Sequence, residues 1–253
     1  MKIYKTYALT IFCVVGTFQL YAQNIINSER ILSKIDSDFV FGASLDGDLK
    51  FGNINLVETN LSTQIGKKIH NNIFRAVFNY SYTSENNEVL SNDWTGQLRL
   101  NHFIKNNSVF FFIQGQNVMS LNIKYRYLFG SGYRMKILGD GDNYLDLSLG
   151  VFKESELYNN NGDDLLINNL RYSISVLSKV KISEKLIFNN TFYWQINTKK
   201  TSDYRLYLEP RFNYSISDDF ELFFALRNRY HSSPYVDIKN NDSQTTFGIE
   251  FTL

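Results

Sequence analysis

The sequence contains little of what many soluble enzymes and nucleic-acid-binding proteins need. Its 253 residues include one cysteine, two prolines and three histidines. So few cysteines and histidines leave little material for a disulfide framework, a zinc site or a histidine-based catalytic site. Lys and Arg total 26 against 25 for Asp and Glu, so there is no basic excess of the kind that binds nucleic acid. The scarcity of proline allows long, uninterrupted strands.

Residues 1–22 have the three parts of a secretory signal peptide. Two lysines supply the positive start, residues 7–18 form an apolar stretch, and a short segment ending at Ala22 suits the peptidase. The apolar stretch is shorter than the roughly 20 residues that a membrane-spanning helix needs. We therefore expect cleavage after Ala22. Cleavage also removes Cys13, which leaves a mature chain without thiols.

Residues 23–37 differ from the rest of the mature chain. Ile31, Leu32 and Ile35 have helical spacing, and Ser28 before them is suited to capping a helix. This spacing predicts a short, helical lead-in located in the periplasm. The alternative is that the segment lies inside a barrel as a plug.

Residues 38–253 alternate apolar and polar side chains with the period of two that is typical of β-strands. Aromatic residues make up 16% of the sequence, and this enrichment also favours strands. Runs between turn signals predict about twelve strands, mostly of the roughly 9–11 residues that cross a bilayer. The predicted fold is therefore all-β, a closed up-and-down antiparallel transmembrane β-barrel.

The predicted connections alternate in length, as they do in outer-membrane barrels, whose long loops lie outside the cell. Tight turns are expected at Asn106-Asn107, residues 183–185 and residues 217–219. Long loops are expected at residues 84–93, 153–164 and 231–242. Parity places the three long loops at one end of the barrel.

A soluble sandwich or a lipocalin-like barrel is the alternative, because it also alternates but hides its apolar face inside. Here Tyr and Trp lie near strand ends with Leu, Ile, Val and Phe between them, which matches an aromatic girdle around a lipid-facing band. Together with the signal peptide, this pattern indicates the bacterial outer membrane. The residues expected to face its lipids include Leu98, Leu170, Phe188, Leu222 and Ile249.

Four segments resemble parts of a known family. Residues 226–234 (LRNRYHSSP) and 242–249 (DSQTTFGI) flank a polar loop, and residues 122–127 (NIKYRY) run into 128–134 (LFGSGYR). They are similar to the last hairpin and the central strand of the salt-induced outer-membrane proteins, domain of unknown function family 481. The resemblance implies a β-barrel in the cell envelope, with no established chemistry.

The C-terminal residues bear on how such a barrel is assembled. Many outer-membrane barrels end on a phenylalanine that the assembly machinery recognises. This sequence ends Phe251-Thr252-Leu253, where leucine is an acceptable apolar substitute. We therefore expect the outer-membrane assembly machinery to be a partner during biogenesis.

No convincing catalytic, metal or cofactor site is present, and we expect no enzymatic activity. His231-Ser232 is similar to the His and Ser of outer-membrane lipases and deacylases, but neighbours in a strand point to opposite faces. Residues 140–143 (DGDN) begin like a calcium loop, but Tyr144 takes the third oxygen position. A tight turn explains these residues better.

Charged residues of both signs lie on the polar faces of the strands and would face the lumen. Those predicted to form one inward cluster are Arg205, Glu209, Arg211, Glu221, Arg227, Arg229 and Glu250. Such residues either brace the wall as cross-strand ion pairs or line a narrow pore that favours anions. We favour bracing. Barrels of eight strands have a packed interior, and barrels of 16–18 strands enclose an aqueous channel. A barrel of about twelve strands lies between them, so the number of strands does not decide whether the lumen is open.

These observations predict a small porin-like or permeability barrel that passes ions or small polar solutes. One alternative is a structural or interaction barrel with a closed lumen and loops that form a partner surface. An outer-membrane hydrolase is the third.

Overall fold

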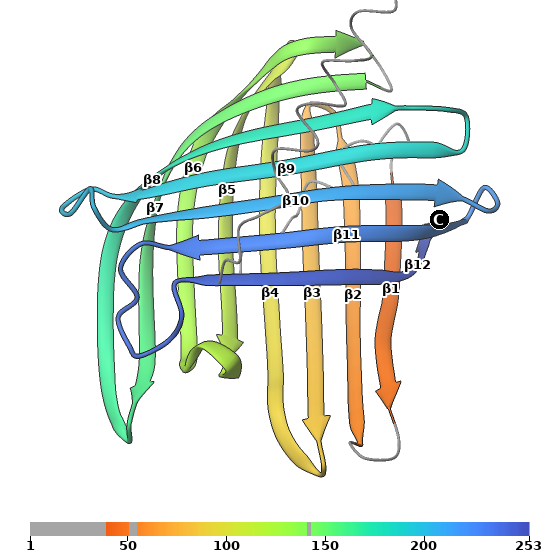
Figure 1. The fold of residues 1–253 in the computed structure, drawn as a ribbon. Coiled ribbons are helices and arrows are strands. Elements are labelled where there is room, and N and C mark those ends of the chain that lie inside the picture. Colours follow the sequence, from red (N-terminus) through yellow and green to blue (C-terminus); the bar gives the residue numbers. More distant parts are fainter. Residues whose placement is uncertain (1–38, 51–54, 141–142, 253) are drawn as a thin grey trace, which may run out of the picture.

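The computed structural model describes residues 39–50, 55–140 and 143–252, which form a closed barrel of twelve antiparallel strands (Figure 1). The strands are β1 (Phe39–Lys50), β2 (Leu56–Ile69), β3 (Asn72–Glu85), β4 (Glu88–Ile104), β5 (Asn107–Val118), β6 (Ile123–Asp140), β7 (Asn143–Asn160), β8 (Asp163–Lys181), β9 (Leu186–Asn197), β10 (Tyr204–Ser215), β11 (Phe220–His231) and β12 (Asn241–Thr252). A single turn of 3₁₀ helix, η1 (Met119–Leu121), follows β5. The predicted fold class and strand number are confirmed. The expected signal peptide (1–22) and lead-in (23–37) lie outside the described residues.

The barrel closes because its first and last strands pair. Gly42 lies opposite Thr252 and Leu45 opposite Ile249, while every other strand pairs with its neighbours in sequence. The closing pairing covers four residue pairs, Gly42–Leu45 against Ile249–Thr252, and joins the sheet edges that a lipid environment would leave without hydrogen-bond partners. In Figure 1, β2–β5 cross β9–β12 at a steep angle, as expected when tilted strands form opposite walls.

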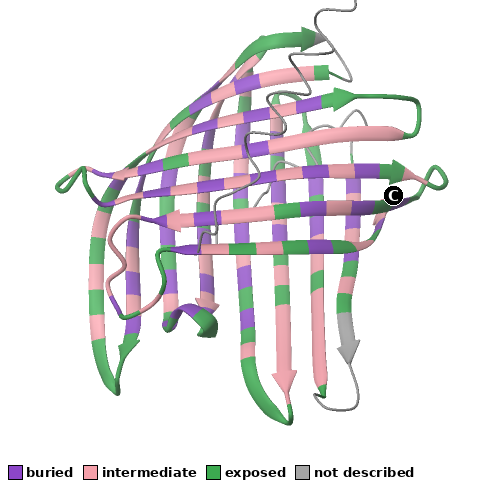
Figure 2. Ribbon diagram, viewed as in Figure 1, coloured by how far each residue is buried: buried purple, intermediate pink, exposed green. Residues whose placement is uncertain are grey.

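The two faces of the wall have the reverse of a soluble protein's polarity. Among the described residues, 36 large hydrophobic side chains are exposed, whereas 34 polar or charged residues and only 15 hydrophobic ones are buried. Figure 2 shows buried and exposed positions alternating along the strands. Leu98, Leu170, Leu222 and Ile249 are exposed as predicted, and Phe188 is half-buried on the same outer face. The apolar surface therefore surrounds the barrel, and the lumen is polar.

The connections divide between two ends. At the loop end, the described connections are residues 86–87, 119–122, 161–162, 198–203 and 232–240. At the turn end they are residues 70–71, 105–106, 182–185 and 216–219. The three connections predicted as long loops therefore share one end of the barrel, as predicted, and the predicted tight turns share the other.

Two of the three predicted long loops are wrong in length. β3 and β4 continue to the two-residue turn Asn86-Asn87, and β7 and β8 continue to Asn161-Gly162. All four turn residues have positive φ, as the two-residue turns of twisted hairpins require. The strands there run through polar, asparagine-rich sequence. The third predicted loop is real and spans residues 232–240.

The outer face generates a prediction about lipid contact. Leu98 is 56% exposed in the middle of the apolar face of β4. Leu98→Arg should destabilise the folded barrel in phospholipid vesicles by roughly 2–4 kcal/mol, because a charge at the bilayer midplane is poorly solvated. Urea-unfolding titrations would measure the loss. Asn92→Arg is the control, because Asn92 lies on the same face but beyond Trp94. It should lower the free energy of unfolding far less. Equal losses would contradict the placement of Leu98 near the bilayer midplane.

The topology generates a second prediction. We expect the loop end to face the outside of the cell, as long loops do in outer-membrane barrels. Cys13 is the only cysteine in the sequence. Asp237→Cys, in the 232–240 loop, should therefore react on intact cells with a membrane-impermeant maleimide, whereas Asp218→Cys, at the turn end, should react only after lysis. The reverse pattern would invert the topology.

Candidate functional site: the polar lumen

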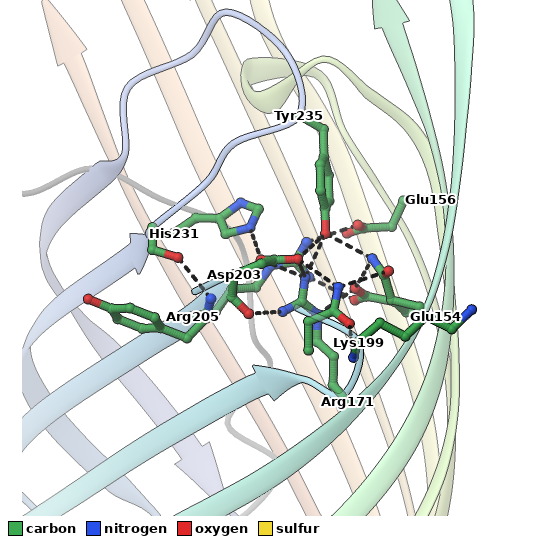
Figure 3. A network of polar contacts seen from close by, with 12 residues as sticks. Glu154, Glu156, Arg171, Lys199, Asp203, Arg205, His231 and Tyr235 are labelled. Atoms are coloured by element: carbon green, nitrogen blue, oxygen red, sulfur yellow. Dashed lines mark hydrogen bonds and ion pairs between the residues drawn. The ribbon is translucent and has the colours of Figure 1, made fainter. Parts of the chain in front are cut away.

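The most completely buried charges in the lumen are arranged around Glu154 on β7 (Figure 3). One oxygen of Glu154 accepts from Arg171 Nε at 2.5 Å, and the other accepts from Arg126 at 3.1 Å and Arg205 at 2.7 Å. Glu156, two residues along the same face, bridges Arg126 and Arg205 at 2.9 Å each. These side chains are no more than 2% exposed. Four strands, β6, β7, β8 and β10, supply these inward positions because alternate residues of each strand face the lumen.

Asp203, in the connection between β9 and β10, extends this arrangement to the mouth of the barrel. Its carboxylate accepts from Arg171 at 2.9 Å, from His231 at 2.8 Å and from the Tyr235 hydroxyl at 2.5 Å. Asn197 donates a further hydrogen bond at 2.9 Å. We call Arg126, Arg171, Arg205, Glu154, Glu156 and Asp203 the arginine–carboxylate network. Its three guanidinium groups balance its three carboxylates, as buried charges require.

The network fixes the 232–240 loop across part of the mouth. The Tyr235 hydroxyl contacts Asp203, and Arg171 and Asn169 donate to it at 2.8 Å each. Next to it, Val236 packs with Val118, Leu121, Ile123 and Tyr158 in a small hydrophobic cluster. The loop that joins β11 to β12 is therefore attached to β5–β8 on the other side of the lumen.

Asp203 and Tyr235, which lie in connecting loops, have shifted pKa values. Burial raises the pKa of Asp203, but hydrogen bonds from His231, Tyr235 and Asn197, with the charge of Arg171, outweigh it and hold that pKa well below its usual range. Burial raises the pKa of Tyr235, and its hydrogen bond to the Asp203 carboxylate acts in the same direction. Asp203 is therefore ionised and Tyr235 neutral at physiological pH.

The seven residues of the predicted lumen cluster all lie on the inner face, but they divide among several partners. Arg205 joins the arginine–carboxylate network, while Arg227 pairs with Glu209 at 2.9 Å. Arg229 pairs with Asp242 at 3.2 Å. Nearer the turn end, Arg211 pairs with Glu250 at 2.5 Å, and Glu221 accepts from Asn213 at 2.6 Å.

A polar cavity of about 430 Å³ occupies the loop-end half of the lumen, beside the network. We call it the chamber. Its wall comes from β1–β4 on one side and β10–β12 on the other, and Val118 and Ser120 complete it near η1. Phe223 and Tyr207 are the aromatic residues buried at its inner side. A cavity of this size is within the range that takes a small solute.

In the turn-end half of the lumen, which is more tightly filled, the buried cations outnumber the three buried carboxylates among the described residues. Its inward cations include Arg75, Arg99, Arg134 and Arg211, all at most 9% exposed. Arg99 and Arg211 lie 4.0 and 3.7 Å from the ring centres of Phe110 and Phe223. The charge of the lumen is therefore divided unevenly along its axis.

Sequence reasoning missed Glu154, Glu156, Asp203 and Tyr235 as members of a site. Residues 153–164 are predicted as a loop, so the alternation that turns Glu154 and Glu156 inward was overlooked. Asn161-Gly162, a strong hairpin signal, could have located the strand end. Asp203 and Tyr235 lie in connections, and no local pattern shows that two loops 32 residues apart meet.

The candidate dyad is not assembled. The Ser232 hydroxyl donates to the Ser202 carbonyl at 2.6 Å and accepts from the Tyr204 backbone N–H at 2.8 Å, whereas His231 is engaged with Asp203. Within the described ranges, no group of three His, Cys, Asp or Glu side chains is arranged to hold a metal ion. Asp140 ends β6 and Asn143 begins β7, and the two residues between them are outside the described chain.

A closed twelve-stranded wall with an apolar exterior and an ionised interior defines an outer-membrane β-barrel, and the bacterial outer membrane is its location. The exposed hydrophobic band excludes the soluble alternatives, because an apolar surface of this extent would cause the protein to aggregate in water. The model of the family described as "Protein of unknown function, DUF481" matches residues 43–253. The chain therefore belongs to this family, as its sequence resemblance implied.

No curated protein matches the chain. Among solved structures, the NanC porin is similar at 14% identity over 85% of this chain and 99% of its own, with a TM-score of 0.44. The KdgM porin matches at 8% identity, 84% and 98% coverage and a TM-score of 0.44. The anion-selective porin from Comamonas acidovorans matches at 8% identity, 85% and 98% coverage and a TM-score of 0.41.

The network generates a prediction about stability. Asp203→Asn should lower the free energy of unfolding by roughly 3–5 kcal/mol, because Arg171 loses a buried partner. Since the pKa of Asp203 is depressed by folding, its contribution is present above the unfolded value of about 3.9 and is lost as pH falls through the lower folded value. Unfolding titrations below about pH 4 should therefore show a steeper loss in the native protein than in the variant.

Asp237→Asn is the matched control, because Asp237 is exposed in the same loop that carries Tyr235. It should leave stability unchanged. If Asp203→Asn behaves like this control at neutral pH, the network does not stabilise the barrel.

Proposed function

We propose that this barrel is a narrow, porin-like permeability protein for ions or small polar solutes. The observation that carries the proposal is the chamber. It is a polar cavity of about 430 Å³, enclosed by the barrel wall and large enough for a small hydrated solute. A barrel that served only as a support has no need of a polar cavity at its mouth. The arginine–carboxylate network supports the proposal of a narrow pore, because its side chains fill lumen space that does not belong to the chamber.

Phe223 supplies the test. Its ring is 5% exposed at the inner side of the chamber, with the Arg211 guanidinium 3.7 Å from the ring centre. Refolded native protein in planar bilayers should show small single-channel currents, and Phe223→Ala should increase the conductance because it removes a ring between the two halves of the lumen. Heat-modified mobility on gels would verify that each variant is folded.

Phe224→Ala is the control, since Phe224 is the next residue in β11 and belongs to the outer face. It should leave the conductance unchanged. If neither the native protein nor Phe223→Ala passes current, the permeability function is wrong.

A closed interaction barrel is the second candidate, and the attached 232–240 loop favours it. The contacts of Tyr235 and Val236 hold this loop in one position, which suits a surface that a partner recognises. Absence of current from folded protein, including Phe223→Ala, would support this candidate over the first.

A further inference from the structure

The charged residues that line the chamber are mostly acidic, although the lumen as a whole contains many arginines. Among the described residues, the lining carboxylates are Asp46, Glu58, Asp93, Glu209 and Asp242, and the lining cations are Arg227 and Arg229. When all are ionised, this described lining has an excess of three negative charges. Both arginines are already paired, Arg227 with Glu209 and Arg229 with Asp242. The number of inward arginines in the sequence predicts a preference for anions. In the chamber, however, the positive charge of both arginines is already neutralised by a carboxylate.

The carboxylates of Asp46 and Glu58 accept hydrogen bonds from the same nitrogen atom, Nδ2 of Asn60. Asn60 Nδ2 donates to Asp46 at 2.8 Å and to Glu58 at 3.1 Å. The two acceptor oxygens therefore lie within about 6 Å of each other, a separation at which like charges repel and a nearby cation is favoured. This wall of the chamber is suited to an ammonium group or a metal cation.

Two buried polar groups at the chamber point to a ligand that also forms hydrogen bonds. The Thr246 hydroxyl and the Nε of Arg229 have no hydrogen-bond partner among the described residues, and both residues are more than nine-tenths buried. Each lines the chamber. Buried polar groups in folded proteins are nearly always satisfied, so these two are candidates to contact a solute.

We infer that the chamber binds small cations and selects them over anions, and that organic ammonium ions bearing hydroxyl groups are among its ligands. This inference rests on the proposed function where it concerns passage, but not where it concerns binding. Fixed negative charge in a confined space is poorly screened and raises the local concentration of cations. The hydroxyls of such a solute can pair with Thr246 and with Arg229.

Ion selectivity is the first measurement. The full mature chain, refolded into planar bilayers under a potassium chloride gradient, should give a reversal potential that shows preference for potassium. The double variant Asp46→Asn, Glu58→Gln keeps the shape of both side chains and removes two of the three excess charges. It should at least halve the potassium-to-chloride permeability ratio.

The matched control is Glu88→Gln with Asp163→Asn, which removes two carboxylates that are exposed at the same end of the barrel but do not line the chamber. Its permeability ratio should equal that of the native protein. A native protein that prefers chloride would overturn the inference. Equal effects of the two double variants would do the same, and either result leaves the permeability function intact.

Binding is the second measurement, and it does not depend on conduction. Calorimetric titration of refolded protein in detergent should detect D-glucosamine, which carries an ammonium group, and not D-glucose, which has the same size without the charge. The Asp46→Asn, Glu58→Gln variant should lose this binding and the control variant should keep it. Binding without any current would retain the inference and reject the permeability function, whereas absence of glucosamine binding would overturn the inference for organic cations.

Discussion

A lipid bilayer offers no hydrogen-bond partners to peptide groups, and this constraint determines both faces of the barrel. Pairing of β1 with β12 removes the free edges that a membrane does not tolerate. Once the wall is closed, the outward side of each strand must be apolar and the inward side can hold charge. The alternation of Leu98 and Arg99 on β4 illustrates the result, since the leucine faces lipid and the arginine is buried.

Closure then creates a second requirement, which is to neutralise the charges placed inside. The arginine–carboxylate network satisfies it locally, by joining its guanidinium groups to carboxylates from other segments rather than by spreading charge evenly. Glu154 is central because three arginines from β6, β8 and β10 meet on it. Around the chamber, carboxylates outnumber cations among the described lining residues, and a cavity remains. Inward charges thus fill one part of the lumen and line an open space in another.

Strand periodicity is a local property, so the sequence was sufficient to predict the barrel, its number of strands and the faces of residues such as Leu222 and Arg211. The sites depend on contacts between distant segments. Arg205 was recognised as inward, but its partners Glu154 and Glu156 are about 50 residues away and were assigned to a loop. A polar strand that extends beyond the membrane lacks the apolar stripe by which a strand is recognised, and only its Asn-Gly turn distinguishes it from a flexible connection.

The unequal lengths of the strands give the barrel a slanted rim. Arg171 on β8 lies opposite Asn197 at the end of β9, so residues 163–170 continue past their neighbour at the loop end, a rise on the order of 25 Å along the strand. Beside this high wall, β9–β12 end early. The 232–240 loop rests against this extension, because Asn169 donates to the Tyr235 hydroxyl and Leu165 and Ile167 pack in the cluster around Val236. The extra length of β8 therefore works as a fixed support that holds the returning loop inward over the lumen.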